Sequence, residues 1–198
     1  MHVAFGLKAH SGWAALVVVG QADGRLTVMD RRRLELVDGK DASWAKQPYH
    51  AAEGLSARDA KQLVERGITA AHRHAFREMR DAVARVERDG HTIGGCAVLM
   101  GQPMPDWSVA DILAVHFRMH KAEGVLFRDA LARAAKQCRQ RVVEIPEKAL
   151  QDHARQVLGT PPPTLAKQIA TLGKAAGPPW GKDQKDAALA AMIALSRV

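Results

Sequence analysis

The chain has 198 residues, of which 47% are hydrophobic and 25% charged, and its net charge is +8. This length is enough for one sizeable core and little more, so we expect a single domain over residues 1–198. No apolar stretch approaches the roughly 20 residues that a membrane span requires, so no membrane partner is expected. The N-terminus lacks the features of a signal peptide, and Cys96 and Cys138 match no metal-ligand spacing. These features predict a cytoplasmic protein with reduced thiols.

Five segments have the pattern of strands, either continuously apolar or alternating between apolar and polar residues. They are residues 2–8, 13–19, 25–37, 92–100 and 141–145. Asp23–Gly24 is typical of a tight hairpin turn between the second and third strands, so the chain is expected to open with an antiparallel meander. Residues 38–54 are polar and are predicted to be irregular.

Helices are indicated by capping residues followed by a 3.6-residue apolar rhythm. Ser56 begins a long helix that ends at Asp89–Gly90, and Ser108 begins another that runs to about Gln137. Three more helices are expected after the last strand, at residues 146–159, from 161 to near 173, and from 182 to the C-terminus. This order predicts an α/β fold with a mixed five-stranded sheet, in which parallel strands continue the three-stranded antiparallel meander and helices cover both faces.

Two carboxylates, Asp183 and Asp186, lie at the start of the Ala/Leu-rich C-terminal helix. Their spacing of three places both on one face, near the positive end of the helix dipole. Such a pair suits a divalent cation, although it is equally consistent with an ordinary helix start.

Three segments carry a resemblance to a known family: Gly6 to Gly12, Val142 to Leu150, and Asp183 to Ala190. The family is that of the RuvC-type Holliday-junction resolvases. The first segment resembles their first strand, which carries a Gly-Ile-Asp-Pro-Gly motif, and the second resembles their fifth strand with the following helix. The third resembles their terminal Asp-x-x-Asp-Ala-x-Ala-Leu signature. These enzymes belong to the ribonuclease H-like superfamily. The resemblance implies a ribonuclease H-like fold.

The chain departs from this family at the metal site. Those nucleases hold two divalent ions with four carboxylates, and the first-strand aspartate bridges both ions. The corresponding residue here is Lys8, whose ammonium cannot ligate a metal, and the expected fourth strand over residues 94–101 contains no carboxylate. Only Asp183 and Asp186 match the family pattern. If Lys8 replaces the lost charge, we expect it within ion-pairing distance of Asp183 or Asp186.

A second group of candidate ligands lies on the long helix after Ser108. His116, His120 and Glu123 fall at i, i+4 and i+7, so they can share one face and offer two imidazoles and a carboxylate to a metal ion. They could equally form a polar strip at the edge of a buried face, or Glu123 could reach the aspartates of the last helix. His50 and Glu53 lie in a loop with the only tyrosine, which either lines a site or packs on itself.

The basic balance favours an anionic partner, and nucleic acid above all, with DNA preferred to RNA. The densest basic clusters are at residues 30–33 and 133–141, and they could equally be solvated faces. We therefore predict a catalytically degenerate nucleic-acid-binding protein that needs no cofactor and holds phosphates on basic surfaces. A homodimer is also considered.

Two other functions stay open. One is an active Mg²⁺- or Mn²⁺-dependent nuclease that uses Asp183, Asp186 and Glu123, with Lys8 in place of the family aspartate. The other is a structural or interaction protein without a nucleic-acid partner.

Overall fold

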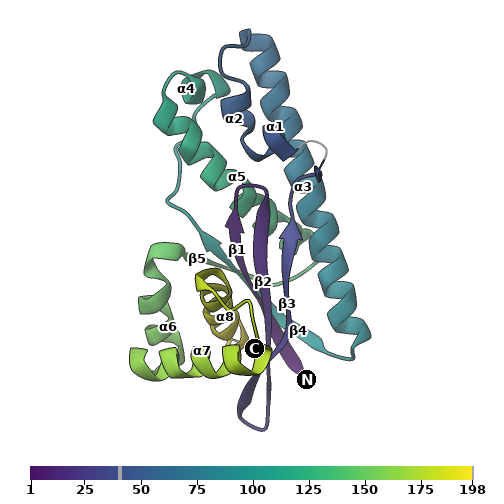
Figure 1. Ribbon diagram of the computed structural model, residues 1–198, viewed down its shortest axis with the longest axis vertical. Coiled ribbons are helices and arrows are strands. Elements are labelled where there is room, and N and C mark those ends of the chain that lie inside the picture. Colours follow the sequence, from purple (N-terminus) through teal and green to yellow (C-terminus); the bar gives the residue numbers. More distant parts are fainter. Residues whose placement is uncertain (40–41, 198) are drawn as a thin grey trace.

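A five-stranded sheet in the order β3-β2-β1-β4-β5 forms the centre of the computed structural model, which describes residues 1–39 and 42–197 (Figure 1). The strands are β1 (His2–His10), β2 (Trp13–Ala22), β3 (Arg25–Glu35), β4 (Thr92–Met100) and β5 (Val142–Pro146). β1, β2 and β3 pair antiparallel, whereas β4 pairs parallel with β1, and β5 pairs parallel with β4. The predicted meander, continued by parallel strands, is confirmed.

The helices are α1 (Ala42–Lys46), α2 (Pro48–Ala51), α3 (Ala57–Arg88), α4 (Val109–Leu113), α5 (His116–Gln137), α6 (Leu150–Leu158), α7 (Pro162–Ala176) and α8 (Lys182–Leu195). A 3₁₀ turn, η2 (Glu147–Ala149), precedes α6. Both predicted serine caps are present, with the side chains of Ser56 and Ser108 accepting hydrogen bonds from the backbone three residues on. In the described part of the chain, no helix has both the length and the apolar character to cross a bilayer.

Two of the predicted elements are wrong in detail. The single helix expected from Ser108 to about Gln137 is divided into α4 and α5, because the β-branched Val115 has an extended backbone and acts as the N-cap of α5. Residues 38–54, expected to be irregular, contain α1 and α2. Pro48 lies in the first turn of α2, where its fixed backbone angle suits a helix start. Pro48 and Tyr49 are buried, so packing against the rest of the protein stabilises this short helix.

The central strand β1 divides the core between the two faces of the sheet. Phe5 and Leu7 belong to the apolar core beneath α3 and α5, whereas Ala4 belongs to the core formed with α6, α7 and α8. Successive side chains of a strand point to opposite faces, so Gly6 and Lys8 share the α8 face with Ala4. The predicted helices on both faces are confirmed, and Figure 1 shows α3 and α8 on either side of the sheet.

A third apolar cluster lies beyond the end of the sheet, where α2 and α4 pack against α3 and α5 (Figure 1). Its buried members are Tyr49, Ala52, Ala60, Val64, Ile112, Met119 and Ala122. This cluster holds α2 against α5 and so fixes the position of His50 relative to the first turns of α5.

The absence of a side chain at Gly6 allows α8 to lie directly on β1. A Cβ atom built at this position would lie 1.8 Å from the carbonyl oxygen of Ala187 and 2.7 Å from the backbone nitrogen of Ala191. Both are backbone atoms inside a helix and cannot rotate away. Glycine is therefore required here by the close approach of two backbones.

We expect Gly6→Ala to lower the free energy of unfolding by about 3 kcal/mol or more, because the added methyl group forces α8 away from the sheet. Gly95→Ala on β4 is a matched control. A Cβ atom at Gly95 also meets α8, but its nearest neighbours lie at 3.6 Å, an ordinary van der Waals distance. Urea denaturation of the two variants measures the difference, and equal stabilities would contradict the packing argument.

Candidate functional site

The ammonium group of Lys8 lies among three carboxylates at one edge of the sheet. Its Nζ atom is 2.7 Å from Oδ2 of Asp186, 3.1 Å from Oε1 of Glu147 and 3.3 Å from Oδ1 of Asp183. Only 6% of the Lys8 side chain is exposed. The predicted ion pairing of Lys8 with the two aspartates is confirmed, and we call these four residues the Lys8 cluster.

Strand direction explains why these residues meet. Lys8 lies near the carboxyl end of β1, Glu147 directly follows the carboxyl end of β5, and the aspartates occupy the first turns of α8. The carboxyl ends of neighbouring parallel strands share one edge of a sheet, which is where α/β proteins commonly bind ligands. Glu147 was not among the predicted site residues. Its position immediately after a strand parallel to β4 was the signal that could have identified it.

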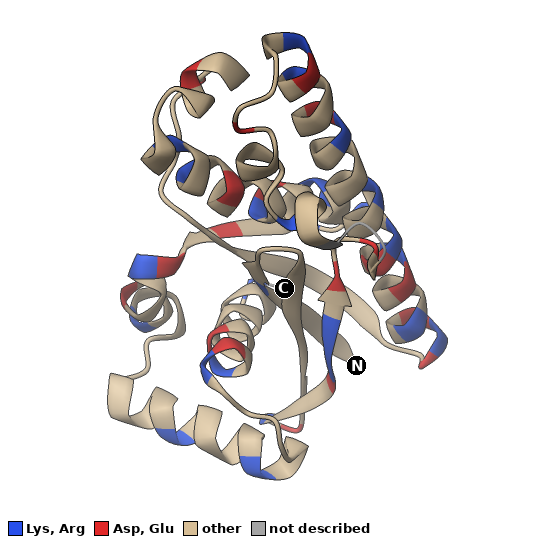
Figure 2. Ribbon diagram, turned by 45° about the horizontal axis from the view of Figure 1, so that its top comes forward, with Lys and Arg blue, Asp and Glu red and all other residues tan. Residues whose placement is uncertain are grey.

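Each carboxylate of the cluster has a second basic neighbour. Glu147 Oε2 lies 3.0 Å from Nη2 of Arg128, and Asp186 Oδ2 lies 2.6 Å from Nζ of Lys182. Asp183 Oδ1 lies 3.1 Å from Nε2 of His10. The three carboxylates therefore face three permanent cations and one imidazole, and their formal charges balance. Figure 2 shows acidic and basic residues side by side at the start of α8.

The pKa values of Lys8, Glu147 and Asp183 move toward the charged forms. Burial lowers the pKa of Lys8, but hydrogen bonds to Asp186 and Glu147 outweigh burial and raise it above its ordinary value. Burial raises the pKa of Glu147, but hydrogen bonds from Lys8 and Arg128 outweigh it and bring the pKa below its usual value. The pKa of Asp183 is also lowered, because the effects of His10 and Lys8 exceed that of burial. These residues are thus stabilised as ions.

A pair of divalent cations does not fit this arrangement. Such ions would need carboxylate oxygens at about 2.0–2.1 Å, the distance typical of Mg²⁺. Here the point on which the three carboxylates converge is taken by Nζ of Lys8, whose three N–H donors match three carboxylate acceptors. A positive charge at this point also repels a metal ion.

The carboxylate of Glu123 is engaged by His50 of α2. Its side chain is only 4% exposed, and its carboxylate accepts hydrogen bonds from the backbone nitrogen of His50 at 3.2 Å and from Nδ1 of His50 at 2.8 Å. Glu123 lines a cavity of about 200 Å³ together with Ala9, His10, Ser11, Gly124, Phe127 and Arg128. Glu147, rather than Glu123, provides the third carboxylate beside the aspartates.

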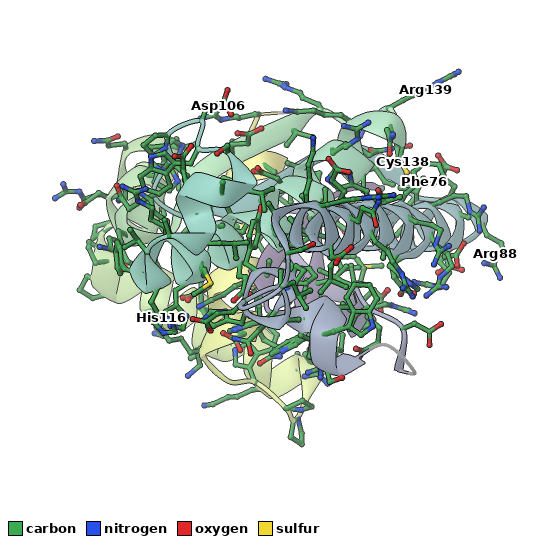
Figure 3. The ribbon with its side chains drawn as sticks, turned by 90° about the horizontal axis from the view of Figure 1, so that it is seen from above. Phe76, Arg88, Asp106, His116, Cys138 and Arg139 are labelled. Atoms are coloured by element: carbon green, nitrogen blue, oxygen red, sulfur yellow. The ribbon has the colours of Figure 1, made fainter. Side chains whose placement is uncertain are left out.

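His116 and His120 share one face of α5, as their spacing predicts, with 3.1 Å between their Nε2 atoms. The third imidazole comes from His50 on α2, whose ring centroid lies 5.1 Å from that of His116 and 4.5 Å from that of His120. Glu123, the predicted third ligand, lies behind His50. Glu53 is exposed to solvent. Figure 3 shows His116 at the margin of the molecule.

The predicted basic surface at residues 30–33 is largely engaged within the protein. Arg31 donates hydrogen bonds to the carbonyl oxygens of residues 177–179, the loop that precedes α8. Arg32 and Arg33 each pair with an acidic neighbour on β3, and Arg33 also lies over the ring of Trp13. Arg31 thereby helps to fix the start of α8, and with it the two aspartates.

Comparison with known proteins identifies the fold. No family model and no curated protein sequence matches the chain. Two solved structures of RuvC from Thermus thermophilus are similar to it. One is 12% identical over 96% of this chain and 92% of that chain, with a TM-score of 0.48. The other, in complex with a Holliday junction substrate, is 10% identical over 96% of this chain and 91% of that chain, with a TM-score of 0.52. The structure in complex with the Holliday junction substrate confirms the predicted ribonuclease H-like, RuvC-like fold.

We expect Lys8→Ala to lower the free energy of unfolding by about 3–5 kcal/mol, because it leaves three partly buried carboxylates without their shared cation. Lys136→Ala is the matched control. Lys136 also pairs with a glutamate, Glu144, but 61% of the lysine and 45% of the glutamate side chain are exposed. That substitution should cost less than about 1 kcal/mol. Denaturation at neutral pH measures both values, and a Lys8→Ala cost as small as the control would contradict a structural role for the ammonium.

Proposed function

We propose that this chain binds nucleic acid through its phosphate backbone and does not cleave it, because Lys8 takes the place of the metal ions of a RuvC-type site. The observation that carries this proposal is the contact of one ammonium with Glu147, Asp183 and Asp186, at 2.7–3.3 Å. The resemblance implies that RuvC-type nucleases have an aspartate at the position of Lys8, and that this aspartate bridges two metal ions. In this chain Lys8 replaces that aspartate, so the metal ligand is lost and an ammonium group supplies positive charge at the same place.

The proposal of a nucleic-acid partner rests on fold and charge together. The similar RuvC structure contains a Holliday junction substrate, and this chain carries a net charge of +8. Because a Holliday junction is DNA, we favour DNA over RNA. Phosphate contacts would give affinity with little sequence preference. A homodimer remains a prediction.

The proposed phosphate site consists of the basic residues beside the Lys8 cluster. A cavity of about 400 Å³ adjoins the cluster and is lined in part by Arg128, Lys148 and Lys182. Lys148 and Lys182 are exposed, and Lys185 is exposed on the next turn of α8. A phosphate approaching this edge would meet these ammonium groups before it met the carboxylates, which are already paired.

The position of Glu123 argues against the nuclease alternative. That mechanism required Glu123 to act with the two aspartates, but both carboxylate oxygens of Glu123 accept hydrogen bonds from His50. The alternative of an interaction protein without a nucleic-acid partner is distinguished from our proposal by a direct binding measurement.

We expect the purified protein to leave branched and linear DNA intact in the presence of Mg²⁺ or Mn²⁺, and Mn²⁺ to leave its melting temperature unchanged. The Lys8→Asp variant has four neighbouring carboxylates and no central ammonium, so Mn²⁺ should raise its melting temperature. Saturation at about 100 times the dissociation constant would add about 2.7 kcal/mol.

The control for this experiment is Glu147→Gln in the Lys8→Asp background, which should abolish the Mn²⁺ effect. Cleavage by the unmodified protein that disappears in Asp186→Asn would overturn the proposal and restore the nuclease alternative.

DNA binding should weaken by about 10³-fold or more between about 50 and 200 mM salt, as expected for several phosphate contacts. Lys148→Ala should reduce the slope of log affinity against log salt by about 1, the change expected for one phosphate contact. Lys61→Ala, an exposed lysine on α3, serves as the control and should leave the slope unchanged. Fluorescence anisotropy with a labelled junction and a labelled duplex measures both effects. Affinity that is independent of salt would argue for the interaction-protein alternative.

A further inference from the structure

We propose that His50, His116 and His120 form a binding site for a divalent transition-metal ion such as Zn²⁺, and that Glu123 orients His50 for this role. The site shares no residue with the Lys8 cluster, and it does not depend on the proposed nucleic-acid function. One ring nitrogen from each of the three histidines lies within 4.8 Å of the others.

The spacing of His116 and His120 matches that of two ligands of one ion. Imidazole nitrogens bound at about 2.0–2.1 Å to a tetrahedral ion lie roughly 3.3 Å apart. The two Nε2 atoms here are 3.1 Å apart, on residues one helical turn apart along α5. His50 completes the triad from α2, across the apolar cluster that holds the two helices together.

The hydrogen bonding of His50 prepares its other ring nitrogen for a metal. Nδ1 is 2.8 Å from Glu123, which fixes the proton on Nδ1 and leaves the lone pair on Nε2. Nε2 is buried and has no hydrogen-bond partner among the residues that the structure describes. A carboxylate that receives the N–H of a ligand histidine is a common second partner at metal sites, because it orients the ring and raises its basicity.

The charge of Glu123 also favours a cation at this place. Its carboxylate is 4% exposed, and its hydrogen bonds come from Nδ1 and the backbone nitrogen of His50. A buried carboxylate without a compensating charge is costly. A divalent ion on Nε2 of His50 would supply that charge through the imidazole ring.

The three donors determine the class of ion. Imidazole nitrogens favour Zn²⁺, Co²⁺, Ni²⁺ and Cu²⁺, whereas Mg²⁺ and Ca²⁺ prefer oxygen ligands. Three protein ligands leave the fourth position of a tetrahedral ion open. Because His116 and His120 are exposed, that position faces solvent, and water or a small anion would fill it.

The test uses the full chain without a polyhistidine tag. We expect Co²⁺ to give the visible absorption bands of a four-coordinate ion, with Zn²⁺ displacing it, and Zn²⁺ to raise the melting temperature where Mg²⁺ does not. His116→Ala and His120→Ala should each abolish the bands; both residues are exposed, so these variants should fold. Glu123→Gln should weaken Zn²⁺ affinity by about 10–100-fold, as measured by calorimetry.

His72→Ala on α3 is the matched control and should bind as the unmodified protein does. Two results would overturn the proposal. One is the absence of Co²⁺ bands and of Zn²⁺ binding in the unmodified protein. The other is full affinity in both His50→Ala and Glu123→Gln, which would reduce the site to an ordinary pair of surface histidines on α5.

Discussion

The direct packing of α8 on β1 is the constraint on which the rest of this molecule depends. At Gly6 the two backbones are so close that no side chain fits between them. This contact brings the first turns of α8 to the end of β1, where Lys8 points to the same face. Arg31 on β3 donates hydrogen bonds to three carbonyl groups of the loop before α8 and so also holds the start of this helix in place. The ion pairs at this edge of the sheet therefore follow from a backbone contact two residues away.

The Lys8 cluster illustrates how a fold can keep a group of carboxylates close together. Bringing three of them to one edge of the sheet costs desolvation and mutual repulsion. Lys8 offsets this cost at the centre, while Arg128 and Lys182 each offset it from outside. Removal of one member exposes the charge of the others, so the energies of these contacts are not additive. The cluster is best regarded as one unit that is stabilised by its own charge balance.

The sequence allowed the sheet, both serine caps and the pairing of Lys8 with the aspartates to be predicted, because each depends on local patterning or on the resemblance of short segments. The break at Val115 was missed, since apolar periodicity continues through it. Glu147 was not predicted because it is far from Lys8 in the sequence. It lies beside Lys8 only because β1, β4 and β5 run parallel, so that their carboxyl ends share one edge of the sheet. The contact of His50 with Glu123 on α5 could not have been predicted from the sequence. The two residues are far apart along the chain, and they meet because the apolar cluster packs α2 against α5.

The cation at the centre of the Lys8 cluster is part of the protein chain, whereas a metal ion at the same place could dissociate. A bound metal ion is in equilibrium with its surroundings, so a chelator or a fall in free magnesium removes it. The ammonium of Lys8 is joined to β1 by covalent bonds, and its concentration at the cluster is therefore fixed by the chain itself. The geometry of Glu147, Asp183 and Asp186 is accordingly independent of the supply of divalent ions, and it is established at the moment the chain folds.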